Sequence, residues 1–317
     1  MKQMTLTGAT GFEKYNKSTR RAAFLAEMDR VVPWSALCEL IEPHYPKAGN
    51  GRPPIGLERM LRIHFLQHWF DLADPAVEEA LYDSLAMRTF VGIDLGREPV
   101  PDETTICKFR HLLEKHHLGD QVFATVNAHL KRCGMKVSTG TIVDATIISV
   151  PSSTNNESGE RDPEMKQTRK GNEWHFGMKA HIGTDSQTKL IHHVAVTSAN
   201  VHDSQVLRHL LHGQERRVYG DSAYAGQKAV IRDVAPQAKD FTQAKAARNR
   251  SLSEDERGKN RAKSKVRAKV EHPFHVVKRI SGFVKVRYRG LAKNAHRVFT
   301  LAALTNLYMA RRKLLAW

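Results

Sequence analysis

Three carboxylate residues in the second half of the chain stand where a carboxylate needs an explanation. Asp144 lies inside an apolar, β-branched run, where a charged group is costly unless it is paired or binds a metal. Asp221 follows a short apolar segment that predicts a strand, and ligands bind beyond the carboxyl ends of strands in open α/β sheets. Glu271 is the one acidic residue in the range 257–317, which is rich in lysine and arginine. Carboxylate oxygens in such a setting are ligands for hard divalent cations.

Each carboxylate also has a structural explanation. Asp144 could be a buried residue that backbone donors satisfy, and taken alone it leaves both explanations open. Asp221 could cap the segment that follows it. Glu271 could pair with Arg267 or another basic neighbour. For Glu271 we favour function, because a lone carboxylate in a basic cleft is typical of a metal site beside phosphates.

Together the three carboxylates predict metal-dependent cleavage of a phosphodiester. The attacking and leaving oxygens both carry charge, and two hard cations roughly 4 Å apart can stabilise both. Lysine and arginine side chains would hold the phosphates outside the metal site. A water or a 3′-hydroxyl is then the nucleophile, so a Ser–His or Cys–His pair is not required. The sequence has no GxxxxGK[ST] and no HExxH motif, so neither a nucleotide cofactor nor a zinc protease is indicated.

The distribution of charge supports a polyanionic partner. The 317 residues include 50 Lys and Arg against 33 Asp and Glu, a formal net charge of +17. Residues 1–140 are nearly neutral, with 18 basic and 17 acidic side chains, whereas residues 141–317 hold 32 and 16. The most basic stretch, 245–297, is followed by an apolar segment at 298–310, which places it inside a fold rather than in a solvated tail. We therefore predict a phosphate-binding face in the second half.

The elements that must position these residues begin with helices. We predict a flexible arm over residues 1–20 and an all-α domain over 21–139 that serves DNA binding or dimerisation. Apolar spacing and capping residues predict helices over 24–41 with an interruption at Pro33, over 56–72, from Asp74 to Met87, over 102–117, and from Asp120 to Lys131. Short connections allow a helix-turn-helix that directs Lys108, Arg110, His111 and Lys115 towards DNA, and an ordinary helical bundle stays open beside it.

At Gly140 the pattern changes to a mixed α/β domain, predicted over residues 140–317. The expected order is three strands, a helix, a strand, a helix, a strand and a long helix, which matches a ribonuclease H-like fold. The strands are expected at 141–150, 173–185, 189–199, 216–221 and 240–244, one helix after Asn200 to Asp203, and the long helix at about 259–280.

Smaller signals in this half have competing explanations. Trp174 lies on the apolar face of the alternating segment 173–185, so we expect it in the core, with stacking on an extruded base as the alternative. His175 and His181 lie on the opposite face and could line a cleft or sit on the surface. His202 and Asp203 could support the site, although Asp203 is expected rather to act as a helix cap.

From about Phe24 to Arg312 the chain resembles the DDE transposases of bacterial insertion sequences, in the insertion-sequence-five family. Any one of the matching segments would be weak, but together they are specific. The segments are IEPHYPKAGNGRPP, PDETTICKFRHLLEKHHL, GTIVDATIISVPSST, KGNEWHFGMKAHIG, ANVHDS, YGDSAYAG and VEHPFHVVKRISGFVKVRYRGLAKN.

The resemblance implies that Asp144, Asp221 and Glu271 are the catalytic and metal-binding triad, with two Mg²⁺ or Mn²⁺ ions per active site. The wider group carries a motif of Tyr, two residues, Arg, three residues, Glu, six residues and Lys. Arg267, Glu271 and Lys278 stand at these spacings, whereas Ser264 occupies the Tyr position. The residues expected at the DNA are Arg267, Lys278, Arg279, Lys179, Lys263, Lys265, Lys269, Arg287 and Arg289.

The expected function is a transposase that binds terminal inverted repeats of double-stranded DNA, hydrolyses the element ends, and joins the 3′-hydroxyls to target DNA as a homodimer or higher oligomer. The alternatives are a ribonuclease H-like nuclease or resolvase without strand transfer, and a non-catalytic DNA-binding regulator derived from a transposase. Three separate cysteines without a CxxC pair, no apolar leader and no apolar run of 18 residues predict a soluble protein of a reducing compartment with no membrane partner. The resemblance implies that the protein is bacterial, cytoplasmic and nucleoid-associated.

Overall fold

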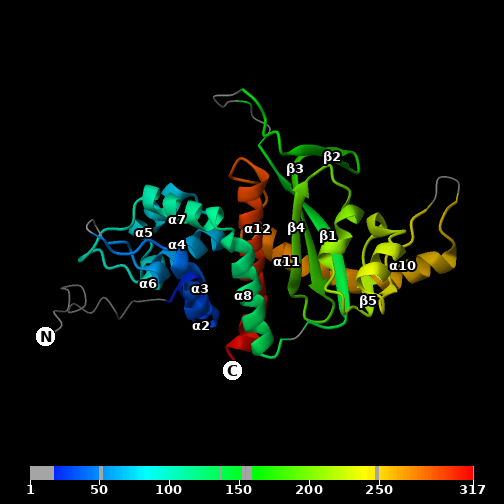
Figure 1. Ribbon diagram of the computed structural model, residues 1–317, viewed down its shortest axis with the longest axis horizontal. Helices are drawn as coiled ribbons and strands as arrows, with labels where there is room; N and C mark the ends of the chain where they lie inside the picture. Colours follow the sequence, from blue (N-terminus) through cyan, green and yellow to red (C-terminus); the bar gives the residue numbers. More distant parts are fainter. Residues whose placement is uncertain are drawn as a thin grey trace.

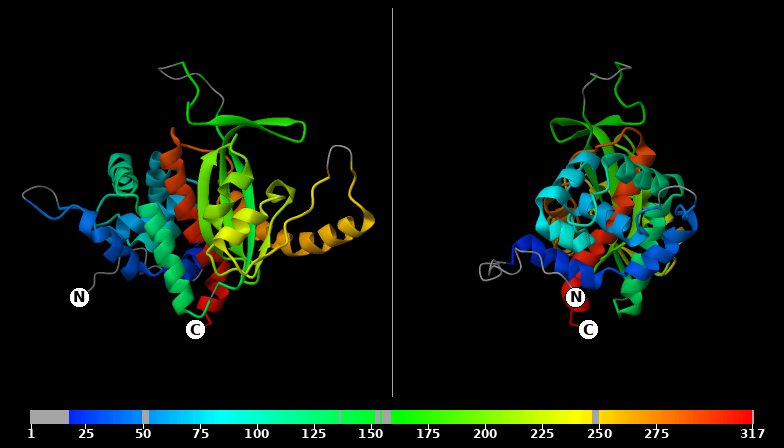
Figure 2. Two further views of the ribbon diagram at one scale, coloured as in Figure 1. Left: turned by 45° about the vertical axis from the view of Figure 1, so that its right-hand side comes forward. Right: turned by 90° about the vertical axis from the view of Figure 1, so that its left-hand side faces the viewer.

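A helical region and a mixed β-sheet lie on opposite sides of the C-terminal helix α12 (Leu291–Leu314) in the computed structural model (Figure 1; Figure 2, left view). The structure describes residues 18–49, 53–135, 137–151, 154, 159–246 and 250–316. The predicted arm at 1–20 therefore falls almost entirely outside the described residues. Within the described ranges, no helix combines the length and apolar character needed to cross a membrane.

The N-terminal region is helical, as predicted. Its helices are α2 (Arg20–Val31), α3 (Trp34–Ile41), α4 (Leu57–Trp69), α5 (Asp74–Asp83), α6 (Leu85–Val91), α7 (Glu103–Lys115) and α8 (Leu118–Arg132), with a 3₁₀ turn at Glu42–His44. Pro33 interrupts the first predicted helix as expected. The helix predicted from Asp74 to Met87 is instead two, because Ser84 is extended and its hydroxyl accepts the Met87 N–H at the start of α6.

The sheet combines antiparallel and parallel strands. The strands are β1 (Gly140–Ser149), β2 (Lys166–Lys170), β3 (Glu173–Asp185), β4 (Ile191–Ser198), β5 (Arg217–Tyr219) and β6 (Lys239–Asp240). The order is β2-β3-β1-β5-β6, with β4 also paired to β3. β3 is antiparallel to β1, β2 and β4, whereas β5 is parallel to β1 and β6. β2 was not predicted, because its sequence KQTRK has no apolar alternation to read.

Other predicted elements differ in kind or length. The helix after Asn200 is the 3₁₀ helix η3 (Asp203–Leu210), and the last strand has two residues rather than five. Two further short elements are the 3₁₀ turn η4 (Ser222–Tyr224) and helix α9 (Lys228–Val234).

The long helix predicted at 259–280 begins earlier and is not uniform. Its parts are α10 (Glu254–Arg267), the 3₁₀ turn η5 (Ala268–Val270), α11 (Glu271–His275) and the π-helical turn η6 (Val276–Ile280). A capping box formed by Ser253 and Glu256 explains the early start. The break before α11 has a local cause: Pro273 lacks the N–H that would bond the carbonyl four residues earlier, and its ring crowds that carbonyl.

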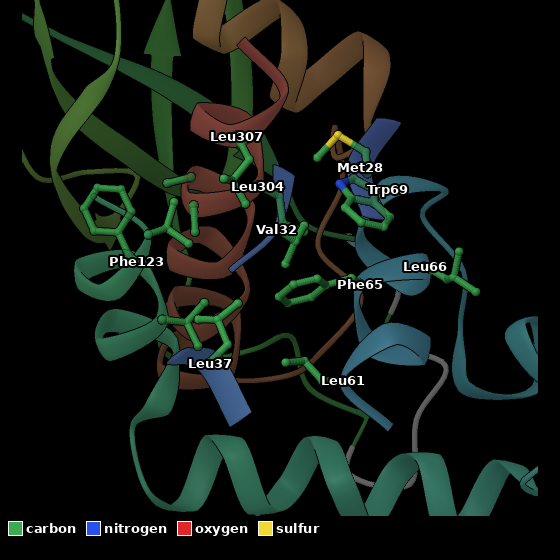
Figure 3. Close-up of a cluster of buried hydrophobic side chains, with 14 of the residues drawn as sticks. Met28, Val32, Leu37, Leu61, Phe65, Leu66, Trp69, Phe123, Leu304 and Leu307 are labelled. Carbon is green, nitrogen blue, oxygen red and sulfur yellow. The ribbon is translucent and has the colours of Figure 1, made fainter. Parts of the chain in front are cut away.

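The helical region and the sheet share one apolar core. The largest buried cluster joins side chains of the N-terminal helices to Ile142 of β1, Ile182 of β3 and Ile191 of β4. Figure 3 shows how α12 contributes: its Leu304 and Leu307 belong to the buried cluster that contains Phe65. α12 therefore joins the two halves of the chain by burying apolar surface against both.

Candidate active site

A cleft of about 630 Å³ opens on the side of the sheet where α10, α11 and η6 pass over β1. Four carboxylates line it: Asp144, Asp203, Asp221 and Glu271. The sheet register explains how two of them meet. β1 and β5 are parallel with Ile142 opposite the last residue of β5, so two residues further on Asp144 and Asp221 stand at the same level of neighbouring strands.

Asp144 is held at the back of the cleft. Its side chain is 10% exposed. One oxygen accepts the Ala145 N–H at 2.8 Å, and the other accepts a bond from Arg267 at 2.9 Å. Burial raises the pKa of this carboxyl to about 6, and the neighbouring Asp221 acts in the same direction while Arg267 opposes it. The carboxylate therefore sits in a place that favours an additional positive charge.

Asp221 and Glu271 are more open than Asp144. Asp221 accepts the Ala223 N–H at 2.9 Å, so the capping role considered for it is confirmed, and its side chain lines the cleft as well. Glu271 is the first residue of α11, and its side chain is 66% exposed. Both carboxylates are available to a ligand that enters from solvent.

The donor set fits a hard divalent cation in its chemistry, because carboxylate oxygens are the ligands that Mg²⁺ prefers. In the described part of the chain, no three His, Cys, Asp or Glu side chains come close enough together to hold a metal ion. Instead, a guanidinium supplies the positive charge. Arg267 lies 2.9 Å from an Asp144 oxygen and 3.9 Å from a Glu271 oxygen.

A fourth carboxylate, Asp203, lines the cleft, where the sequence left a supporting role open to it. It was expected to cap a helix, but the preceding His202 takes that position through its ring nitrogen. Asp203 instead pairs with Lys179 at 2.9 Å, and the same ammonium donates to the Val201 carbonyl. Asp203 lies in the ANVHDS segment, which is one of the segments that carry the family resemblance.

Basic side chains from several elements surround the carboxylates. Of the nine residues expected at the DNA, four line the cleft: Arg267, Lys278, Arg279 and Lys179. Arg169 and Lys170 of β2 also line it and were not predicted. Lys278 donates to the Ile147 carbonyl at 2.8 Å, and burial lowers its pKa.

The other five expected DNA contacts lie outside this cleft. They are Lys263, Lys265, Lys269, Arg287 and Arg289. Lys263 donates to the backbone carbonyl of Thr242, and Lys269 donates to that of Ser186. Arg287 instead donates to the carbonyl of Asp71 in the helical region.

Ser264, where the resembled group has tyrosine, accepts a 2.6 Å bond from Gln243. Asn260, one turn earlier on α10, bonds both the N–H and the carbonyl of Ala244. These contacts fasten α10 to the chain that follows β6, although no residue of α10 is fully buried. The fastening fixes where the end of α10, and with it Arg267, enters the cleft.

The prediction that Trp174 belongs to the core is wrong. Trp174 is 67% exposed, because this end of β3 extends beyond β1 and pairs with β2 alone. His181, expected in the cleft or on the surface, is buried beside Thr197, 2.8 Å from its hydroxyl. Burial lowers the pKa of His181 to about 4. His175 is half-buried and does not line the cleft.

Arg110 does not face outward as the helix-turn-helix hypothesis expected. It is buried, and it pairs with Asp74 at 2.8 Å and Glu114 at 3.0 Å. The other three residues of that hypothesis, Lys108, His111 and Lys115, are exposed on α7. His111 and Lys115 line a separate pocket together with residues of α12.

A mixed sheet that brings carboxylates of adjacent strands into a basic cleft defines a site suited to metal-dependent chemistry on a phosphate polymer. Comparison with known families agrees. The Transposase DDE domain family matches residues 136–307, more than half of the chain, and the Transposase domain (DUF772) family matches residues 13–112. The chain belongs to the DDE transposase family, and it is a metal-dependent DNA transposase.

Among solved structures, the chain is similar to a piggyBac transposase in a synaptic complex with hairpin DNA, determined by cryo-electron microscopy. The two are 10% identical, with a TM-score of 0.46, and the match covers 91% of this chain and 73% of the other.

Proposed function

We propose that Asp144, Asp221 and Glu271 are the catalytic residues of this transposase and that they bind two divalent ions, Mg²⁺ or Mn²⁺. The observation that carries the proposal is that all three line one cleft although they come from β1, from the end of β5 and from α11. When bound, the ions would polarise the scissile phosphate and activate the attacking hydroxyl. The carboxylates would hold them and offset their charge.

The remaining residues of the cleft bind the substrate in this proposal. Arg267, Lys278, Arg279 and Lys179 hold phosphates beside the cut, joined by Arg169 and Lys170. Lys263, Lys265, Lys269, Arg287 and Arg289 extend the DNA contact beyond the cleft. Trp174 stacks on an extruded base, a role that its exposure on the basic β2–β3 hairpin supports.

We assign residues 140–317 to a ribonuclease H-like catalytic domain and residues 21–139 to DNA binding or dimerisation. The antiparallel set β4-β3-β1 joined to the parallel strands β5 and β6 supports the first assignment. Two or more protomers bring together two inverted repeats on the DNA of a bacterial nucleoid. Water cleaves the phosphodiester at each element end, and the freed 3′-hydroxyl then attacks a target phosphodiester, releasing a target 3′-hydroxyl.

End cleavage and strand transfer in vitro with Mg²⁺ test the proposal. Asp144→Asn, Asp221→Asn and Glu271→Gln should each lower cleavage at least about 100-fold. Removing a group that only supports a metal ligand typically costs about 10–100-fold in activity, and losing a ligand itself should cost more. Asp233→Asn is the matched control, because Asp233 is an exposed carboxylate paired with Arg208 outside the cleft. Wild-type cleavage by any triad variant would refute the assignment, and nicks without joined products would indicate a nuclease.

A further inference from the structure

Arg267 lies among the three carboxylates that we propose as metal ligands. Its guanidinium bonds the deepest carboxylate, Asp144, and lies 3.9 Å from Glu271. Asp221 is a further attractive charge for the same guanidinium. The cation of the arginine therefore neutralises part of the same carboxylate set that we propose for the metal ions.

The contacts of this arginine are incomplete. A guanidinium has five donors in a planar fork, suited to bidentate binding of a carboxylate or phosphate. Here a single nitrogen donates to Asp144, and Nε is buried with no hydrogen-bond partner among the described residues. The side chain is only partly buried, at 27% exposed. A phosphate oxygen in the cleft would satisfy donors that the resting site leaves unpaired.

We infer that Arg267 is an internal counter-ion that covers the Asp144 carboxylate until a DNA phosphate draws the guanidinium away, so that divalent ions load after DNA. This inference rests on the proposed function of the triad. It adds an order of events: the free protein binds metal weakly, and DNA opens the metal site.

The physical basis is competition between cations for one carboxylate. A divalent ion approaching Asp144 meets both the existing ion pair and the repulsion of the guanidinium. A phosphate beside the cleft offers Arg267 an alternative anion, which removes both obstacles. Because linkage is reciprocal, DNA should tighten metal binding by the same factor by which metal tightens DNA binding.

The first experiment measures Mn²⁺ affinity of the full chain without DNA, from the electron paramagnetic resonance signal of free Mn²⁺. Arg267→Gln should bind Mn²⁺ about tenfold more tightly than wild type, within the usual range for linked sites. Arg279→Gln is the control, because it removes the same charge from the same cleft with no ion pair to Asp144. We expect that control to change the affinity by less than about threefold, since its charge acts only at a distance.

A conservative variant separates charge from folding damage. Arg267→Lys keeps a cation that can reach Asp144, so its Mn²⁺ affinity should stay near wild type. Thermal unfolding of each variant shows whether it is folded before titration. Equal Mn²⁺ affinities for wild type and Arg267→Gln, or an equal gain in the lysine and glutamine variants, would overturn the inference.

The second experiment repeats the titration with a saturating short duplex. Wild type should gain Mn²⁺ affinity. Arg267→Gln should gain little, because its Asp144 carboxylate is not covered by a guanidinium even without DNA. An equal DNA-dependent gain in both proteins would overturn the inference. Asp144→Asn distinguishes the two proposals. If it leaves Mn²⁺ binding unchanged, the triad assignment fails; if it abolishes binding while Arg267→Gln matches wild type, the counter-ion role alone fails.

Discussion

Two arginine–carboxylate clusters in this protein use the same residue types in different surroundings. In the helical region, Arg110 is 8% exposed and contacts both Asp74 and Glu114 at 3.0 Å or less. In the cleft, Arg267 is about a quarter exposed, with one close contact to Asp144 and a longer approach to Glu271.

The difference separates a structural pair from one that can exchange partners. Arg110 also lies over the Tyr288 ring, 4.2 Å from its centre, so packing and two carboxylates hold it together. Arg267 opens onto a cleft that a phosphate or a cation can enter. The number of bonds and the access to solvent, rather than the residue types, tell the two roles apart.

The largest effect on stability should come from breaking the buried cluster. Arg110→Ala leaves Asp74 and Glu114 as uncompensated buried charges, which costs about 3–5 kcal/mol. Arg267→Ala should cost less, about 1–3 kcal/mol, because only Asp144 is buried and left without its cation, whereas Glu271 is 66% exposed to water. Urea unfolding of both variants measures the difference. Equal losses would show that the cleft pair is structural too.

Acid should destabilise the helical region through its buried histidines. Burial lowers the pKa of His64 from 6.5 to about 3, and its ring nitrogens have no hydrogen-bond partner among the described residues. The neutral ring thus contributes stability that is fully present above pH 6.5 and is lost as the pH falls towards 3. The loss is about 1.4 kcal/mol per pH unit for such a group.

His64→Leu removes this group and tests the effect. The variant should show a shallower loss of unfolding free energy between pH 6.5 and 5 than wild type, measured by urea titration at each pH. An unchanged slope would mean that the ring is protonated in the native state or accessible to water. His111→Leu serves as the control, because His111 is an exposed histidine of α7.

The cleft should respond to pH in the opposite direction. The pKa of Asp144 is raised to about 6, so its contribution to stability is complete below pH 3.8 and is lost as the pH rises through 6. Asp144→Asn should therefore raise the unfolding free energy at pH 7 by about 3 kcal/mol without divalent metal, and by almost nothing at pH 4. Thermal unfolding in a chelating buffer checks both values. A loss of stability at pH 7 would contradict the burial argument.

The smallest effect on stability should come from Trp174. Because the ring is largely exposed, Trp174→Ala should change the unfolding free energy by less than about 0.5 kcal/mol. If the ring stacks on a base, affinity for a DNA end should fall by about 1–3 kcal/mol. Fluorescence anisotropy with labelled DNA measures the affinity. Wild-type binding would remove the stacking role.

Sequence patterns predicted the helical first half, most strands and the change at Gly140, because apolar periodicity and capping residues are local signals. They also singled out three of the four carboxylates that line the cleft, since charge inside an apolar strand or within a basic run is visible without coordinates. β2 was missed because its residues are all polar. The exposure of Trp174 depends on β3 extending beyond β1, which no local pattern reveals.

The ion-pair partners of the charged residues could not be predicted from the sequence either. Arg267 and Asp144 are 123 positions apart, and only the crossing of α10 over β1 brings them together. The helix-turn-helix hypothesis could place Arg110 at DNA because its helical position was known but the packing of α5 against α7 was not. Asp203 was taken for a cap because the backbone conformation of η3 is not encoded by a simple spacing.

The placement of α12 has a consequence for synthesis of the chain. Helices α2 to α8 are synthesised before the strands of the sheet, and α12, which completes their core, follows only after those strands. At about 5–20 residues per second, the interval between the end of α8 and the start of α12 is roughly 8–30 seconds. During that time an incomplete helical bundle exposes apolar surface. The nascent transposase should therefore depend on chaperones until α12 has been synthesised.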